Sequence, residues 1–391
     1  MLVLLAGSWF RYQVLSNFLV YLLAGRSLFK LLTYDKIRES TAFLTAIIFM
    51  TTYGINYWIL NQGFTSWGTS LLPLCLIPLV DLKNHHFPIV KIALSMAVMT
   101  QIHTLTAMML GLIYFPFFID YARKQWGRAL LELGKTVGLY VCLSINVWIS
   151  LFLINRGDQL KMPFTNPEMS EKAIDLGGAY WLHYPGNLRL LLIAGLLLNL
   201  VYWHKTRRFT KQLLIFSGIF FIFSTSLIPW DWLVAHQVPL ISLIQFPFRF
   251  FAPFMVLFLF CLASLLQDLA GKRILFGGLL LLSVISIGQS LQLLTHDLNQ
   301  WDKQSLASKH TFVRVSEAAA RKSFYSKDLG KALKAVEKSS PDYLPIYHND
   351  TKNKYVSYEK QILDNQTNFS KTVKNDQLVL SWQAKEAGRI Q

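Results

Sequence analysis

The sequence is dominated by long apolar stretches that alternate with short polar segments. Several of these stretches exceed 15 residues and contain almost no charged side chain. A helix needs about 20 apolar residues to cross the hydrocarbon core of a bilayer, which is roughly 30 Å thick. We therefore predict an all-α polytopic membrane bundle of about ten transmembrane helices, at residues 1–23, 41–60, 68–81, 88–102, 104–120, 136–154, 188–204, 211–229, 248–267 and 274–294.

The Lys and Arg residues are concentrated in alternate loops of this predicted bundle. Segments 24–40, 120–135 and 204–211 carry four each, whereas segments 61–67 and 230–245 carry none. Cytoplasmic loops of membrane proteins are enriched in Lys and Arg, so the basic loops are predicted to be cytoplasmic. The sequence thus predicts a multi-pass protein of the cell membrane. Arg249 and the C-terminal tail are expected on its outer side.

Composition agrees with a membrane protein and argues against other classes. Apolar residues make up 53% of the chain, and the net charge of +16 is distributed over alternate loops, so we expect no nucleic-acid partner. The three cysteines, Cys75, Cys142 and Cys261, lie in apolar stretches and are interpreted as small apolar side chains. There is no Walker loop, HExxH or paired CxxC motif. We therefore predict no metal and no cofactor.

Two domains are predicted: a transmembrane helical bundle at 1–294 and an extracytoplasmic tail at 295–391, where Lys, Asp, Ser and Asn become frequent. Helical spacing predicts helices over 304–324 and 327–339, and alternation predicts strands over 354–363 and 377–382. Two short strands do not form a stable sheet alone, so a β-rich domain is expected to be truncated at the end of the chain. The chain begins at the outer end of a predicted span, which fits either a native start or a fragment that lacks upstream spans.

The stretch SLIQFPFRFFAPF places Arg249 between two prolines at the predicted outer surface. One interpretation is an interfacial anchor that reaches lipid phosphate. The other is a clamp for the phosphate of a lipid-linked substrate, because a guanidinium binds phosphate through two parallel hydrogen bonds. Trp230 and Trp232 flank the same loop as anchors or substrate contacts. Asp231 is either an ion-pair partner of Arg249 or a catalytic carboxylate.

Two further outer segments carry residues of interest. His103 stands at a predicted turn between two short spans, where its ring either bonds a freed backbone carbonyl or acts as a general base or sugar-hydroxyl partner. Loop 155–187 contains Asp158 among its acidic residues, with Trp181 and His183 further on. Carboxylates beside aromatic rings suit carbohydrate, although acidic residues of a loop are usually only solvated.

Four segments resemble one family, the bacterial polytopic proteins labelled "6-pyruvoyl-tetrahydropterin synthase related", which are akin to the YfhO-like envelope proteins. They are NQGFTSWGTSLLPL (61–74), QIHTLT (101–106), LIQFPFRF (243–250) and DYLP (342–345). The label implies no pterin chemistry. The spans are similar to those of membrane glycosyltransferases with the GT-C fold. The first segment departs from the family, because Gln62 and the pair Trp67–Gly68 stand where Arg and Glu are common.

The resemblance implies a GT-C-like glycosyltransferase, or a relative of one, that uses a polyprenyl-phosphate-linked sugar or another anionic lipid on the outer face. Arg249 with Gln245 would hold the donor phosphate, and the catalytic acid of this fold would lie in an outer loop upstream of Met1. Whether the chain is itself an enzyme is left open. The alternatives are a lipid or polymer transporter or flippase, for which Arg11 and Lys91 are charged residues within spans, and a non-catalytic envelope-assembly scaffold.

Overall fold

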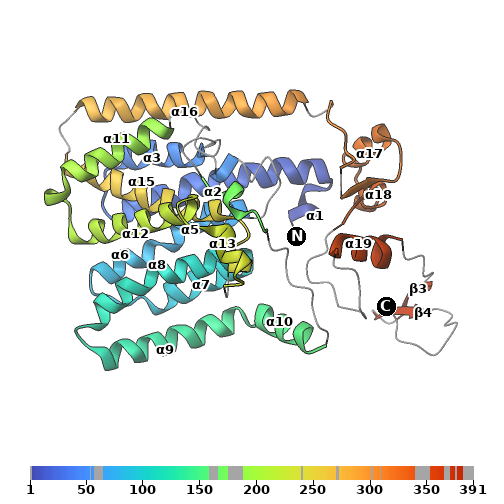
Figure 1. The fold of residues 1–391 in the computed structure, drawn as a ribbon, viewed down its shortest axis with the longest axis horizontal. Helices are drawn as coiled ribbons and strands as arrows, with labels where there is room; N and C mark the ends of the chain where they lie inside the picture. The colour runs from blue at the N-terminus through green and yellow to red at the C-terminus, as the bar shows by residue number, and fades with distance from the viewer. Residues whose placement is uncertain are drawn as a thin grey trace.

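The computed structural model describes residues 2–52, 54–56, 65–157, 166–174, 188–238, 241–269, 273–300, 303–308, 310–339, 353–364, 370–374 and 377–381. Most of the described residues form helices packed in one bundle (Figure 1). The helices of the bundle are α1 (Leu2–Ala6), α2 (Trp9–Tyr34), α3 (Glu39–Met50), α5 (Thr65–Cys75), α6 (Ile77–Lys83), α7 (Ile89–Ile102), α8 (Thr104–Ala122), α9 (Trp126–Leu143), α10 (Ile145–Gly157), η1 (Met169–Lys172), α11 (Leu188–Val201), η3 (Trp203–Lys205), α12 (Arg208–Ser224), α13 (Trp230–Ala235), α14 (Ile241–Ile244), η4 (Pro247–Phe250), α15 (Phe251–Asp268) and α16 (Arg273–Gln300).

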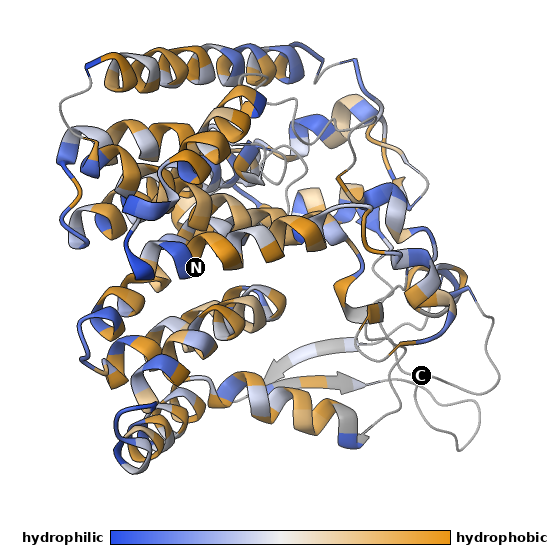
Figure 2. Cartoon of the chain, turned by 60° about the vertical axis from the view of Figure 1, so that its left-hand side comes forward, coloured by the Kyte–Doolittle hydropathy of each residue, from blue (hydrophilic) through white to orange (hydrophobic). Residues whose placement is uncertain are grey.

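Helix α15 forms the centre of the bundle. Its sequence is apolar all round, and nearly every residue from Phe251 to Leu265 is buried. A helix that is hydrophobic on every side has to be surrounded by other helices. Helix α15 accordingly packs against α12, α3, α5, α2 and α11. In Figure 1 the helices α16 and α9 lie at the two edges, and Figure 2 shows that these outer helices are also largely hydrophobic.

The described part of the chain holds four helices that are long and apolar enough to cross a membrane: α2, α8, the continuous segment Pro247–Asp268 and α16. A fifth crossing is formed if α9 and α10, which are bent by 67°, make one span. The protein is therefore mostly helical and membrane-embedded, but ten spans are not confirmed. Helices α3, α7 and α11 have only 12, 14 and 14 residues. At about 1.5 Å per residue, 14 residues extend roughly 21 Å, less than the hydrocarbon thickness.

The basic loops gather at one end of the bundle, which we call the basic end. It consists of the ends of α2, α6, α8 and α15 with the starts of α7, α9, α12 and α16, on the left in Figure 1. Ion pairs join these loops: Lys83 to Asp35 at 2.5 Å, Arg208 to Asp120 at 2.9 Å and Arg207 to Asp268 at 2.9 Å. The charge pattern that the sequence predicted for alternate loops thus corresponds to one end of the folded molecule.

The tail forms small elements at the opposite end of the bundle (Figure 1). Strands β1 (Thr311–Val313) and β2 (Val336–Lys338) pair antiparallel, with Phe312 opposite Glu337, around α17 (Glu317–Ser323) and α18 (Leu329–Ala335). Helix α19 (Lys354–Tyr358) continues into the π-helix η5 (Glu359–Leu363), and β3 (Ser370–Lys374) pairs with β4 (Gln377–Ser381).

The predictions for the tail hold in part. A strand near 377–382 is confirmed by β4, and each range predicted to be helical contains one helix of seven residues. The predicted strand at 354–363 is wrong, because this segment is helical. Tyr355, Tyr358 and Ile362 are three and four residues apart, which places them on one helical face. In addition, the side chain of Asn353 accepts a hydrogen bond from the backbone N–H of Tyr355 and caps the helix.

The tail is attached to the start of α2. The indole Nε1 of Trp9 donates a hydrogen bond to the carbonyl of Leu329 at 2.9 Å, and the backbone N–H of Phe10 donates to the carbonyl of Phe324 at 3.0 Å. The ring of Phe10 also stacks on Tyr325, with 4.5 Å between ring centroids. These contacts join the last part of the chain to its first long helix.

Candidate functional site at the end opposite the basic loops

Three segments that are distant in sequence meet at the end of the bundle opposite the basic loops. Helix α5 approaches the turn between α7 and α8 so closely that a Cβ on Gly68 would lie 3.3 Å from Thr106 Oγ1 and 3.6 Å from His103 Cβ. His103 in turn interacts electrostatically with Arg249 in η4. The structure therefore brings together parts of the segments NQGFTSWGTSLLPL, QIHTLT and LIQFPFRF. The close approach at Gly68 was not predicted from the sequence.

His103 ends α7 and caps the N-terminus of α8. Its Nδ1 atom accepts a hydrogen bond from the backbone N–H of Thr106 at 3.3 Å and lies 2.8 Å from Thr106 Oγ1. Burial first, and then the positive charge of Arg249, lower the pKa of His103 to about 4. The imidazole is therefore neutral at pH 7. Because Nδ1 accepts, the ring proton is on Nε2, which makes His103 a hydrogen-bond donor to any group that approaches its other edge.

Arg249 is held by its own loop. Its Nη1 atom donates to the carbonyl of Ile244 at 3.1 Å and to Gln245 Oε1 at 3.2 Å, and its guanidinium lies over the ring of Phe246 at 4.9 Å. Its Nε atom is buried and has no hydrogen-bond partner among the described residues. No carboxylate of those residues forms an ion pair with Arg249 either. A half-buried cation whose buried Nε lacks a hydrogen bond and whose charge lacks a counter-ion is costly, so it indicates a site for an anion.

Gln245 has an unusual backbone conformation that helps to position Arg249. Its φ angle is +58°, in the left-handed region that non-glycine residues rarely adopt. Such backbone strain is concentrated at functional sites, where the surrounding structure maintains it. Here the strained residue turns the chain from α14 into η4 and supplies the Oε1 atom that accepts from Arg249. The two residues predicted to hold a phosphate are thus adjacent.

Trp230 and Trp232 both belong to α13 but have different environments in the structure. Trp230 is only 1% exposed, its Nε1 donates to the carbonyl of Thr225 at 3.0 Å, and its ring stacks on Phe250. The prediction that Trp230 contacts a substrate is therefore wrong, because its ring is part of the core. Trp232 is 55% exposed and stacks on His236 with 4.2 Å between centroids. Its ring remains accessible.

Asp231 is not the counter-ion of Arg249. Its Oδ1 atom accepts a hydrogen bond from the backbone N–H of Ser170 at 2.8 Å. Ser170 belongs to η1, whereas Arg249 belongs to η4. The carboxylate is exposed at the start of α13 and binds η1 there. The ion-pair interpretation of Asp231 is therefore wrong, and in the structure Asp231 attaches η1 to the start of α13.

The segment around η1 covers part of the site. Met169 is fully buried, and η1 packs against both α13 and η4. Ile174 extends this contact, because its N–H donates to the carbonyl of Ser224 at 2.7 Å and its carbonyl accepts from Ser226 at 3.2 Å. The sequence analysis missed this cover; the apolar Met169 and Ile174 within an acidic loop were the available signal. Asp158, Trp181 and His183 lie outside the described residues.

The site presents hydrogen-bond donors and one positive charge. Among the described residues no group of three or more His, Cys, Asp or Glu side chains is arranged to hold a metal ion. Arg249 and neutral His103 both donate, and no carboxylate in the described part of the chain forms an ion pair with either of them. Such an arrangement can bind an anionic oxygen, as in a phosphate group, and can stabilise negative charge that develops on it.

Comparison with known proteins gives no relative of this chain: no family model, no curated protein and no solved structure matches it. The resemblance of the four segments to the YfhO-like envelope proteins therefore stays a prediction.

Proposed function

We propose that this membrane-embedded protein belongs to a bacterial cell envelope and binds a polyprenyl-phosphate-linked sugar at its outer face, as a GT-C-like glycosyltransferase or a relative of one. The observation that carries the proposal is the half-buried guanidinium of Arg249, whose Nε atom is fully buried. It has no counter-ion among the described residues, and its Nε atom has no partner. A phosphate oxygen would satisfy both needs at once.

The sidedness of the site supports an outer-face substrate. Helix α15 ends at Asp268, which pairs with Arg207 at the basic end, so η4 and Arg249 lie at the other end of that helix. The tail lies at this other end too, attached through Trp9 and Phe10. If the basic end is cytoplasmic, as the positive-inside rule predicts, Arg249 and the tail both face outward.

In the proposed reaction an acceptor hydroxyl attacks the anomeric carbon of the sugar. The new bond forms between that carbon and the acceptor oxygen, and the bond from the carbon to the phosphate oxygen breaks. Negative charge then grows on the polyprenyl phosphate, where Arg249 stabilises it and the Nε2–H of His103 donates a further hydrogen bond. The exposed ring of Trp232 packs on the sugar. The acceptor proton passes to a carboxylate, for which Asp158 remains a candidate.

The test compares Arg249→Ala and Arg249→Lys in bacterial membranes that contain the protein, with transfer of a radiolabelled sugar from polyprenyl phosphate as the readout. Arg249→Ala should abolish transfer. Arg249→Lys should retain part of it, because the charge survives without the two-pronged donor. Arg11→Ala is the matched control, since Arg11 is an exposed arginine in the first turn of α2 at the same end. Wild-type transfer by Arg249→Ala would contradict the proposal.

The scaffold alternative has one observation in its favour, the attachment of the tail to α2 through Trp9. Deleting residues 354–391 should remove function in a scaffold, while Arg249→Ala should not. The transporter alternative has less support. Lys91 pairs with Asp81 at 2.8 Å at the basic end, and Arg11 is exposed at the opposite end, so neither charge lies midway along a helix. Substrate accumulation in sealed vesicles separates transport from transfer.

A further inference from the structure

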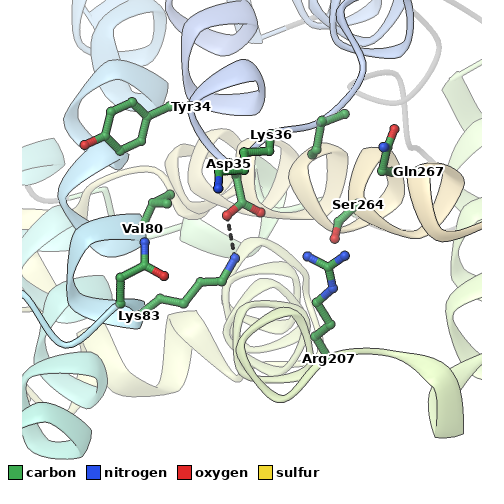
Figure 3. A pocket seen from close by; sticks show the side chains of 10 residues that line it. Tyr34, Asp35, Lys36, Val80, Lys83, Arg207, Ser264 and Gln267 are labelled. Carbon is green, nitrogen blue, oxygen red and sulfur yellow. Dashed lines mark hydrogen bonds and ion pairs between the residues drawn. The ribbon is translucent and has the colours of Figure 1, made fainter.

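A second polar site lies at the basic end of the bundle, far from Arg249. It is a cavity of about 300 Å³ between the end of α2, the end of α6, the start of α12 and the end of α15. Its polar lining includes Asp35, Lys36, Lys83, Arg207, Ser264 and Gln267. In Figure 3 the side chains of Lys83 and Arg207 extend toward the same space, with Ser264 beside the guanidinium.

The charges around this cavity are unbalanced. Three cations and one carboxylate line it. Asp35 pairs with Lys83 at 2.5 Å, which leaves Lys36 and Arg207 without a counter-ion in the lining. Asp268, outside the lining, takes only the Nη2 atom of Arg207, at 2.9 Å. The Nε and Nη1 donors of the guanidinium form no hydrogen bond to the described residues. The cavity therefore keeps a positive excess with unused donors.

Lys36 occupies a position where glycine is usual. It follows the C-cap of α2 with φ +63°, and helices commonly end in this left-handed conformation at a glycine because a side chain strains it. The lysine is exposed, and its ammonium group forms no ion pair with the described residues. Because the lysine strains the backbone here, its positive charge is the property that explains its presence at this position.

Helix dipoles explain only part of this charge. Lys36 follows the C-terminus of α2 and Lys83 lies in the last turn of α6, so both offset the negative ends of helices. Arg207 is different. It is the N-cap residue of α12, a helix of 17 residues whose N-terminus has no side-chain cap. A cation is unfavourable at the positive end of a helix, whereas an anion is favourable there.

We infer that this cavity binds a phosphate-bearing anion at the basic surface of the membrane domain. Arg207 offers its Nε and Nη1 donors, Lys36 offers an ammonium group, and the backbone N–H groups at the start of α12 add to them. Gln267 adds a donor too, because its Oε1 already accepts from the backbone N–H of Arg38 at 3.1 Å, which leaves its Nε2 free to donate. Either an anionic lipid headgroup or soluble phosphate supplies this chemistry.

The experiment uses the whole chain purified in a non-ionic detergent. Sodium phosphate is titrated in one arm, at constant ionic strength set with sodium chloride. Phosphatidylglycerol is titrated in the other, with phosphatidylcholine as the uncharged control. The midpoint of thermal unfolding reports binding in both arms, because a ligand that binds only the folded state raises it. Native mass spectrometry counts the lipids that are bound.

Lys36→Gly and Arg207→Gln should each raise the Kd for the anion about tenfold, the loss expected when one charge-assisted hydrogen bond is removed. Lys36→Gly is the sharper variant. Glycine relieves the strained φ, so the variant should fold at least as well as the wild type while binding is lost. Arg273→Gln is the matched control: it removes an exposed arginine at the same end of the bundle but outside the cavity.

A higher unfolding midpoint with phosphatidylglycerol but not with phosphate would identify a lipid headgroup as the ligand, and the reverse would identify soluble phosphate. Either result supports the site if the rise in the midpoint is smaller in Lys36→Gly. Equal stabilisation of the wild type and Lys36→Gly, or an equal loss in Arg273→Gln, would overturn the inference, because general surface charge would then explain the effect. A wild type that responds to neither ligand would also overturn it.

Discussion

The imidazole of His103 and the guanidinium of Arg249 lie close enough for the charge of one to lower the pKa of the other. They come from different helices, the turn before α8 and the 3₁₀ turn before α15. Because His103 stays neutral, the pair carries one positive charge and several donors. A site built in this way favours an anionic oxygen over a cation.

Replacing Arg249 with methionine should stabilise the protein while removing ligand binding. The guanidinium is half-buried, and its buried Nε has no hydrogen-bond partner among the described residues, so an apolar side chain of similar length removes the cost of that unpaired donor. We expect a gain of about 1–3 kcal/mol in the free energy of unfolding. Thermal unfolding in detergent measures it. A lower midpoint of thermal unfolding in Arg249→Met would show that the guanidinium stabilises the fold. A similar loss in Gln245→Leu would then identify Gln245 as the partner through which it does so.

His103 should remain neutral down to about pH 4. Its ordinary pKa of 6.5 is lowered to about 4 in the folded protein, so the unfolded chain binds the proton first as the pH falls. Stability is therefore full above pH 6.5 and decreases progressively toward pH 4. Histidine NMR shifts report the titration, and His103→Gln should remove this part of the pH dependence. In Arg249→Met the pKa of His103 should rise, though burial will keep it below 6.5.

A side chain at Gly68 should be less favourable than one at an open helical position, because its Cβ would crowd the turn at His103. A Cβ there would lie 3.3 Å from Thr106 Oγ1, and would push α5 away from the turn at His103. Gly111 is the matched control, because its Cβ would lie at an ordinary 3.7 Å from the flexible end of Met96. Gly111→Ala should stabilise its helix by up to about 1 kcal/mol. Gly68→Ala should lose that gain and reduce sugar transfer. Equal unfolding midpoints for the two variants would contradict the close approach.

The two tryptophans of α13 should respond differently to substitution. Trp230→Phe leaves the carbonyl of Thr225 without its donor in a buried place, so we expect a loss of about 1–3 kcal/mol in stability. Trp232→Ala should leave the unfolding midpoint nearly unchanged but weaken binding of the sugar ligand, because the ring is exposed beside the site. Denaturation and ligand titration on both variants test this pair. A destabilised Trp232→Ala would show that the ring is structural.

The sequence predicted the membrane character, the helices and the grouping of basic loops, because each depends on composition or on short-range periodicity. Arg249 and Gln245 were predicted to act together, and η4 places them in contact. The burial of Trp230 could not be predicted, since it depends on Phe250 and Thr225 reaching the same place. The helix at 354–363 was missed because a short segment with Tyr355, Val356 and Tyr358 fits both a strand and a helix.

The bond between Trp9 and Leu329 has a consequence for biogenesis. Leu329 lies 320 positions after Trp9 in the sequence, so α2 is synthesised well before the residues that hold its start. Until those residues emerge from the ribosome, Trp9 Nε1 and the backbone of Phe10 lack these partners. Insertion of α2 and fastening of its start are thus separate events in time, and the second must wait until Leu329 has been translated.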